Sequence, residues 1–159
     1  MIKLVVFDLD GVLVDARDLH YDAMNLALAD IAPECIISRE EHLSTYDGLP
    51  TTKKLGLLTE HKNLSSDLYN DIWKAKQDKT VQLINSMIAA HRMAQTLSEL
   101  KKSGYKIYVG SNSVKHTIKM MLLRRGLIEF VDEIFSNQDV NHPKPHPEIY
   151  LRCMIHAGV

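Results

Sequence analysis

The sequence predicts an α/β protein in which helices cover both faces of a parallel β-sheet. Short apolar runs at residues 3–7, 106–109 and 131–135 show no alternation of polar and apolar side chains, which is typical of strands buried on both faces. Segments with apolar residues at helical spacing precede the second run (93–102) and the third (114–124). This alternation indicates a doubly wound sheet, in which ligands bind at the carboxyl ends of the strands.

Composition limits the classes of partner. Hydrophobic residues make up 45% of the 159 residues and charged residues 25%, as in ordinary folded domains, and the formal net charge is −1. A nucleic-acid-binding protein would carry more positive charge, so we expect no such partner. Asp8 and Asp10 interrupt the apolar N-terminal run, so we expect neither a signal peptide nor a membrane partner. Cys35 and Cys153 form no C-x-x-C pair, which fits a reducing cytoplasm.

A long region between the first two strands has the features of helices. Residues 18–30 carry apolar side chains at helical spacing, and Pro33 ends that pattern. Further helix starts are expected at Ser38 with Glu41 in a capping box, at Thr51 or Thr52 (through Leu58), and at Ser65 or Ser66 (to about Ile84). We therefore expect an α-helical insertion over residues 15–89 and an α/β core formed by residues 1–14 and 90–159.

Two aspartates directly follow the first strand, in a turn that contains glycine. Phosphoryl transfer needs a nucleophile and a proton donor for the leaving group, and Asp8 and Asp10 can divide these tasks. Asp8 would attack phosphorus and form an aspartyl-phosphate, while Asp10 would protonate the leaving oxygen and later deprotonate the attacking water. Gly11 lets the backbone pass close to the phosphate, and Leu9 is counted with it among the phosphate-binding positions. The same tetrapeptide also occurs as a turn with helix-capping carboxylates.

Polar side chains also follow the other two predicted strands. Ser111 and Asn112 come after the second strand, where Ser111 could alternatively be the N-cap of the next helix. Lys144 follows the third strand in a turn with three prolines, where it could alternatively be a solvated loop lysine. Since Asp8, Ser111 and Lys144 all lie at strand ends, their combination favours a phosphoryl-transfer site over these separate structural roles.

Three segments resemble the motifs of one family, the haloacid dehalogenase (HAD)-like hydrolases. Residues 7–15 (FDLDGVLVD) resemble its first motif, residues 107–113 (IYVGSNS) its second and residues 143–150 (PKPHPEIY) its third, in the family's order. The resemblance implies a Rossmann-like core with an α-helical cap, within the phosphatase or beta-phosphoglucomutase-like branch.

The resemblance also implies roles for single residues. The hydroxyl of Ser111 and the next backbone N–H, that of Asn112, would hold the phosphoryl group, and the ammonium of Lys144 would neutralise it. Mg²⁺ would be the cofactor, bound by Asp8 and by the carbonyl of Asp10.

The predicted cap has a segment that corresponds to the substrate-specificity loop of related caps. Tyr46, Gly48, Thr51, Lys53 and Lys54 lie in it, so the resemblance implies contact with a small phosphorylated metabolite. The alternative for Lys53 and Lys54 is a position on a solvated helix face.

The family's fourth motif, an acidic strand end that completes the Mg²⁺ site, has no counterpart before Val159. Without the strands of that region, the first strand would have an exposed apolar edge, which tends to pair with another chain. We therefore hypothesise either a fragment of a longer enzyme or a homodimer formed through this edge. His142 and His146 show no metal-ligand spacing, and we expect them to be solvated loop residues.

The function that these residues favour is Mg²⁺-dependent hydrolysis of a small phosphomonoester through an aspartyl-phosphate. One alternative is a sugar-phosphate mutase of the beta-phosphoglucomutase type, which would use the same residues. A dehalogenase is disfavoured because of the second aspartate. The non-enzymatic alternative is a catalytically inactive HAD-like binding module, suggested by the absent fourth motif.

Overall fold

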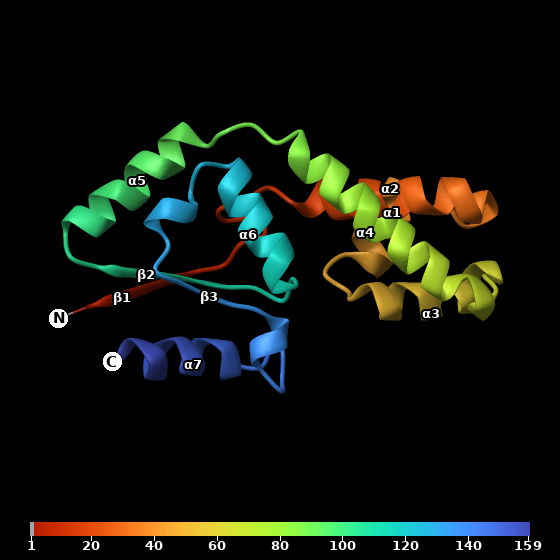
Figure 1. Cartoon of the computed structure of the whole chain (residues 1–159). Coiled ribbons are helices and arrows are strands. Elements are labelled where there is room, and N and C mark those ends of the chain that lie inside the picture. Colours follow the sequence, from red (N-terminus) through yellow and green to blue (C-terminus); the bar gives the residue numbers. More distant parts are fainter. Residues whose placement is uncertain (1) are drawn as a thin grey trace. The chain divides into compact units, whose positions relative to one another are not determined.

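The computed structural model describes residues 2–159. The chain divides into two compact units. One consists of Met1–Ala16 together with Ile84–Val159, and the other of Arg17–Leu83. The first, called here the sheet unit, contains β1 (Leu4–Phe7), α5 (His91–Lys102), β2 (Lys106–Gly110), α6 (Lys115–Arg124), β3 (Glu133–Phe135) and α7 (Glu148–Ala157). The second, the helical unit, contains α1 (Arg17–Ile31), α2 (Arg39–Glu41), α3 (Thr51–Lys62) and most of α4 (Tyr69–Asn85) (Figure 1). The expected α/β fold is confirmed, whereas the role of the helical unit as a cap stays a prediction.

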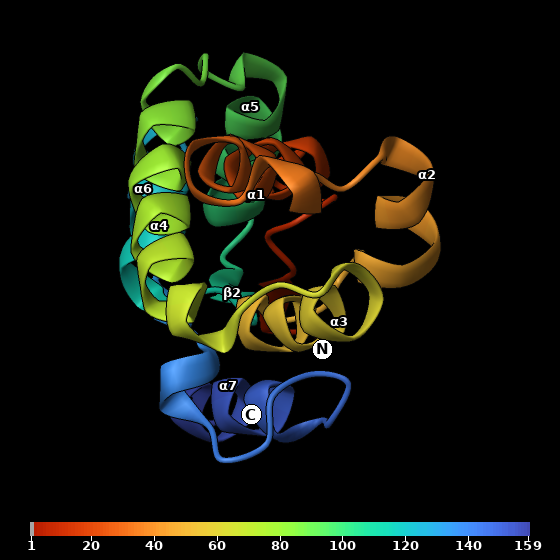
Figure 2. The same ribbon diagram turned by 90° about the vertical axis from the view of Figure 1, so that its right-hand side faces the viewer.

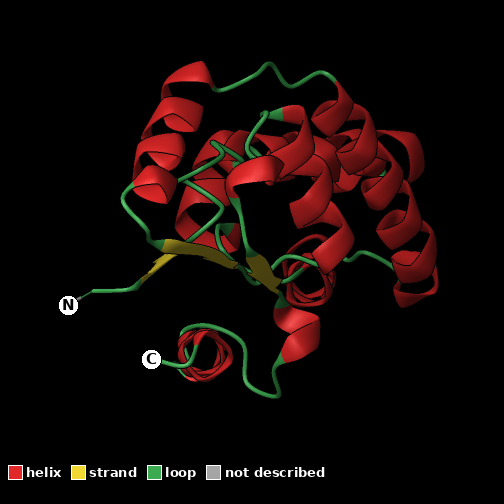
Figure 3. Ribbon diagram, turned by 60° about the vertical axis from the view of Figure 1, so that its left-hand side comes forward, coloured by secondary structure: helices red, strands yellow, loops and turns green. Residues whose placement is uncertain are grey.

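The sheet is parallel throughout, with strand order β1–β2–β3. Ile107 and Val109 in the central strand β2 are fully buried, because α5 and α6 cover one face of the sheet and α7 the other (Figures 1 and 3). All four residues of β1 are only half-buried. Burial on both faces therefore holds for β2 but not for β1, which pairs on one side only among the described strands.

The third strand is shorter than the sequence pattern predicts. β3 begins at Glu133 instead of residue 131, because a 3-10 turn over Ile128–Phe130 precedes it. Asp132 joins this turn to β2, since its carboxylate accepts the Ile107 N–H at 2.8 Å and its own N–H donates to the Ile107 carbonyl at 2.8 Å. These bonds fix the start of β3 against β2, and the register pairs Phe135 with Gly110, so the two strands end level at the edge where the predicted site residues gather.

The helix starts in the helical unit follow the capping rules only in part. Ser38 and Glu41 form the predicted capping box, and Ser65 accepts from the Asp67 N–H at the start of a 3-10 turn that leads into α4. The predicted threonine cap is wrong: Pro50 is the N-cap of α3, with no side-chain cap, and Thr51 is its first helical residue. Pro50 can take this position because its fixed φ suits a helix start.

The helical unit has its own hydrophobic core. Figure 2 shows α1, α3 and α4 around it, and each contributes fully buried side chains, for example Leu28, Leu58 and Ile72. Tyr46 belongs to the same core and is only 2% exposed. Among the described residues, no helix combines the length and apolar composition that crossing a membrane requires.

Candidate active site

The carboxyl ends of the strands bring together two residues that are far apart in the sequence. Asp8 directly follows β1, and Lys144 lies on the loop between β3 and α7. The Lys144 ammonium donates to Asp8 Oδ1 at 2.7 Å and to the Gly110 carbonyl at 3.0 Å. The Lys144 side chain is 16% exposed and that of Asp8 39%, so the pair is shielded on the lysine side and accessible on the carboxylate side.

The turn after β1 is held by its own backbone. The Leu9 carbonyl accepts N–H bonds from Leu13 and Val14, and the Gly11 N–H donates to the Val14 carbonyl at 2.7 Å. Gly11 has φ +78°, a left-handed conformation that favours glycine. The Leu9 side chain is fully buried and its N–H donates to Asp8 Oδ1 at 2.7 Å. Only the backbone of Leu9 is therefore available for contact with a ligand. Asp10, between them, is half-buried.

Ser111 lies at the end of β2 but does not cap the following helix. Val114 is the N-cap of α6, and the Ser111 hydroxyl instead accepts the Ser113 N–H at 3.1 Å. The Ser111 N–H donates to the Phe135 carbonyl at 3.0 Å, which links the ends of β2 and β3. Because Ser111 is fully buried, contact between its hydroxyl and a phosphoryl group requires a local opening of this loop.

Asn112 connects the loop after β2 to the loop that carries Lys144. Its side-chain Nδ2 donates to the Lys144 carbonyl and its Oδ1 accepts the Lys144 N–H, both at 2.9 Å. Both side-chain polar groups of Asn112 are thus used to fix the backbone of Lys144. The sequence predicts Asn112 as a phosphate-binding residue, and this geometry leaves its backbone N–H for that role.

Glu148 is a structural residue of the site that the sequence interpretation missed. Its carboxylate accepts the backbone N–H groups of Asn141 and His142, at 3.0 and 2.9 Å, and the Arg152 guanidinium at 2.9 Å. These bonds, led by the Asn141 N–H, lower the pKa of Glu148 from 4.5 to about 2. Glu148 therefore closes the proline-rich loop at its base. The acidic residue in the first turn of a helix was the only signal in the sequence.

The residues predicted for the substrate loop differ in how far their side chains are exposed to solvent. Gly48 is exposed with φ +71°, Thr51 is half-buried and Lys53 is exposed. Tyr46 is buried in the core of the unit, so its placement indicates packing and gives a substrate contact no support. Lys54, next to Lys53, is 7% exposed.

Basic side chains are buried inside the helical unit at His42, Lys54 and Lys76. Sequence reasoning placed Lys54 in the substrate loop or on a solvated helix face, and it missed the other two. His20 is half-buried, and its pKa is lowered to about 3, first by desolvation and then by the positive charges of Lys76, Lys54 and His42. Burial also lowers the pKa of Lys54. A faint signal existed, because Lys54 precedes the core residue Leu58 by one helical turn and so shares its face. Buried lysines are rare without a binding or pairing role.

The parallel sheet, with Asp8 and Lys144 in contact at the carboxyl ends of its strands, is an α/β arrangement shared by a class of proteins. Residues 5–159 match the haloacid dehalogenase-like hydrolases, and the chain belongs to this family. Among curated proteins, it is 28% identical over 155 residues to pyrophosphatase PpaX from Bacillus cereus (strain Q1), an alignment covering 92% of this chain. Bacillus anthracis PpaX matches with the same identity and coverage. The chain spans 65% of the length of these relatives.

Solved structures of related proteins have the same fold. CbbY from Rhodobacter sphaeroides, crystallised with xylulose-(1,5)bisphosphate, is similar with a TM-score of 0.82 at 23% identity, over 100% of this chain and 74% of that one. Beta-phosphoglucomutase from Clostridium difficile is similar with a TM-score of 0.75 at 25% identity, over 100% of this chain and 72% of that one.

Proposed function

We propose that this chain carries the catalytic core of a phosphomonoester hydrolase that works through an aspartyl-phosphate on Asp8. The observation that carries the proposal is the contact between Asp8 and Lys144, at 2.7 Å, at the carboxyl ends of parallel strands. Asp8 Oδ1 is held by Lys144 and by the Leu9 N–H. The second carboxylate oxygen, which has neither of these bonds, is the atom that attacks phosphorus in this proposal.

The neighbouring residues supply the remaining parts of the reaction. Lys144 neutralises the carboxylate in the free protein and the transferred phosphoryl oxygens during the reaction. Asp10 gives a proton to the leaving oxygen in the first step. In the second step it takes a proton from the water that hydrolyses the aspartyl-phosphate, so its carboxyl group returns to the protonated form. In this scheme the Asn112 N–H binds a phosphoryl oxygen, and the Ser111 hydroxyl joins it when its loop opens. The N–H groups of Leu9 and Gly11 take part by exchanging their bonds to Asp8 Oδ1 and to the Val14 carbonyl.

The donor atoms near Asp8 fit Mg²⁺ in kind. A carboxylate oxygen of Asp8 and the backbone carbonyl of Asp10 are the hard oxygen ligands that this ion prefers, and the Asp8 side chain is 39% exposed. Mg²⁺ keeps several waters in many protein sites, which allows binding by a small number of protein oxygens. When bound, the ion would neutralise charge on the phosphoryl oxygens.

We infer that the substrate is a small phosphorylated metabolite. The support is chemical: Lys54 and Lys76 place two positive charges inside the helical unit, and the nearby carboxylate of Asp47 offsets only one charge, which favours an anionic ligand. It is also comparative, since relatives include a pyrophosphatase and a structure crystallised with a sugar bisphosphate. Gly48, Thr51 and Lys53 remain proposed contacts, and Tyr46 is no longer included. Cys35 and Cys153 are both free and buried, which supports the cytoplasmic location that we propose.

The second candidate function is that of a sugar-phosphate mutase. The similarity to beta-phosphoglucomutase from Clostridium difficile, at 25% identity, favours it. A mutase would return the phosphoryl group from Asp8 to a sugar instead of water. Glucose 1-phosphate turnover that requires a catalytic amount of a sugar bisphosphate would select the mutase, and phosphate release without it would select the hydrolase.

The test of the proposal is Mg²⁺-dependent hydrolysis of p-nitrophenyl phosphate by the whole chain. We expect Asp8→Asn to lower kcat/KM by at least about 1,000-fold, because the variant lacks a nucleophile. Asp78→Asn, which changes an exposed carboxylate on α4, is the matched control and should keep the wild-type rate. A folded wild-type protein without turnover, but with bound phosphate, would instead indicate an inactive binding module.

A further inference from the structure

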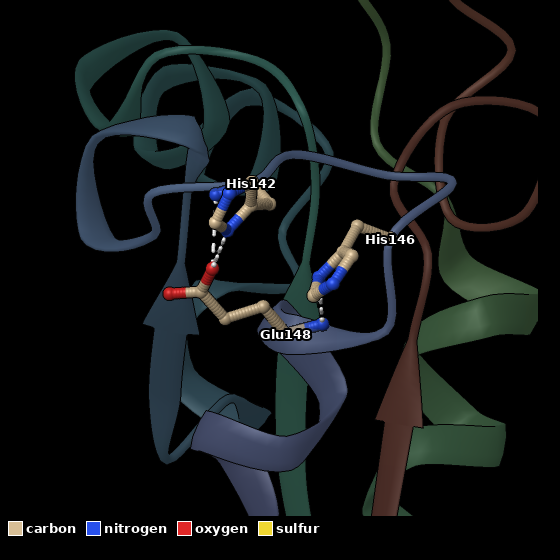
Figure 4. Close-up of side chains that lie close together, drawn as sticks. All are labelled: His142, His146 and Glu148. Atoms are coloured by element: carbon tan, nitrogen blue, oxygen red, sulfur yellow. Dashed lines mark hydrogen bonds and ion pairs between the residues drawn. The ribbon is translucent and has the colours of Figure 1, made fainter.

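Three potential metal ligands gather on the proline-rich loop that carries Lys144. His142 and His146 lie on the loop, and Glu148 is the first residue of α7 (Figure 4). One ligand atom from each of the three residues lies within 4.8 Å of the others. His142 Nδ1 is 3.1 Å from Glu148 Oε2, and the centroids of the two imidazole rings are 4.8 Å apart. The sequence interpretation, which treated both histidines as solvated residues, missed this cluster.

The ligand types select a particular class of metal ion. Two imidazoles and one carboxylate suit borderline ions such as Zn²⁺, whereas Mg²⁺ prefers oxygen ligands alone. Ligand bonds of about 2.0–2.2 Å place neighbouring donor atoms of a tetrahedral zinc ion roughly 3.4 Å apart. The His142–Glu148 distance of 3.1 Å is close to that value. His146 is exposed, and its ligand nitrogen, now within 4.8 Å of the other two ligand atoms, has to move closer to them when an ion binds.

The loop backbone is fixed before any ion binds. Pro143, Pro145 and Pro147 restrict it, since proline fixes φ. Asn112 holds it at Lys144 through two hydrogen bonds of 2.9 Å, and Glu148 Oε1 accepts the Asn141 N–H and the Arg152 guanidinium. Oε2 accepts the His142 backbone N–H at 2.9 Å and lies 3.1 Å from His142 Nδ1. Binding therefore costs little backbone entropy. An ion would use the second lone pair of Oε2, while Oε1 keeps its bonds to Asn141 and Arg152.

We propose that His142, His146 and Glu148 form a binding site for a divalent transition-metal ion of the Zn²⁺ type, with water completing the coordination. This site is separate from the oxygen ligands proposed for Mg²⁺ at Asp8, and it does not depend on the proposed function. In the metal-free loop, His142 Nδ1 pairs with Glu148 Oε2 and His146 Nδ1 accepts the Glu148 N–H at 3.2 Å. The ion has to replace these two bonds, so we expect micromolar affinity instead of that of a structural zinc site.

Isothermal titration calorimetry with ZnCl₂ tests the proposal on the whole chain, with any purification tag removed. We expect the double variant His142→Gln/His146→Gln to bind Zn²⁺ at least about 100-fold more weakly than wild type, since both imidazole ligands are lost. Glutamine keeps a polar side chain, and a thermal melt checks that the variant is folded. His61→Gln, which changes an exposed histidine on α3, is the matched control and should bind as wild type does.

A second variant separates this site from the strand-end carboxylates. Asp8→Asn should retain full Zn²⁺ affinity, because Asp8 is not a ligand of the proposed site. Paramagnetic Ni²⁺ should first broaden the NMR signals of the His142 and His146 imidazoles. Equal Zn²⁺ binding by the double variant, loss of binding in Asp8→Asn, or no binding by wild type would each overturn the proposal.

Discussion

At the scale of single residues, the side chain of Asn112 positions the loop of Lys144. Its amide makes two hydrogen bonds of 2.9 Å to the backbone of Lys144, whose ammonium in turn contacts Asp8 at 2.7 Å. The sequence places Asn112 next to Ser111 and so suggests a phosphate contact, because neighbours at a strand end share one site. The pairing of a side-chain amide with a backbone 32 residues away cannot be seen in a local pattern.

This role of Asn112 predicts a kinetic effect. In Asn112→Ala, the loop loses both bonds and Lys144 becomes less ordered, so we expect kcat for p-nitrophenyl phosphate to fall by about tenfold or more. Asn70→Ala, at an exposed position of α4, is the control and should keep the wild-type kcat. Equal rates for Asn112→Ala and the wild type would show that Lys144 needs no support from this amide.

At the scale of elements, the proline-rich loop and α7 are joined through one carboxylate. Glu148 begins α7 and accepts the N–H groups of Asn141 and His142, while Arg152 reaches it from one turn further along the helix. The bonds of Glu148 therefore close the loop after β3 at its base, and Lys144 lies between the two ends of this loop. An acidic residue in the first turn of a helix ordinarily interacts with the N–H groups of that helix. Here Glu148 instead accepts N–H groups of the preceding loop.

The lowered pKa of Glu148 predicts a pH dependence of stability. Its ionised form is favoured in the folded state, so its contribution is present above the ordinary value of 4.5 and is lost as the pH falls towards about 2. We expect Glu148→Gln to lower the Tm at pH 6, and the difference from wild type to shrink as the pH decreases through this window. Thermal melts measured by circular dichroism give this difference. Glu129→Gln, at an exposed position, should show no such convergence, and a constant Glu148 difference would refute the assignment.

At the scale of the whole molecule, the described sheet has a free edge at β1. β1 pairs only with β2 among the described strands. Beside it lies a groove of about 490 Å³ lined by Ile2, Lys3, Leu4, Val6, Tyr150, Met154 and Val159. Several of these apolar side chains are exposed, Ile2 by 72% and Met154 by 45%. An apolar groove next to an unpaired strand edge favours association with a further strand.

We propose that copies of this chain associate through this edge. Sedimentation velocity over a range of concentrations should show a dimer, and Met154→Lys should shift it to monomer by placing a charge in the groove. Ile155→Lys is the matched control, because the adjacent Ile155 is 79% exposed and does not line the groove. A wild-type chain that remains monomeric at every concentration would contradict the proposal.

Several local features of this protein follow from the amino-acid sequence alone. The buried strand at 106–109, the capping box at Ser38 and the glycine-bearing turn after Asp8 each follow from neighbouring residues, because propensity, capping and φ preferences act over a few positions. The α/β class followed from the alternation of such segments. The order of the three motifs was likewise readable along the chain.

The contacts between residues that are distant in the sequence depend on the tertiary structure. It pairs Lys144 with Asp8, ties Asn112 to the Lys144 backbone and brings His142 and His146 to Glu148. These contacts depend on the side-by-side ends of parallel strands and on how a loop closes, so composition and spacing do not specify them. The same holds for burial: Tyr46 and Lys54 lie inside the helical unit, because packing against other helices, and not the polarity of each residue, sets which positions lose contact with water.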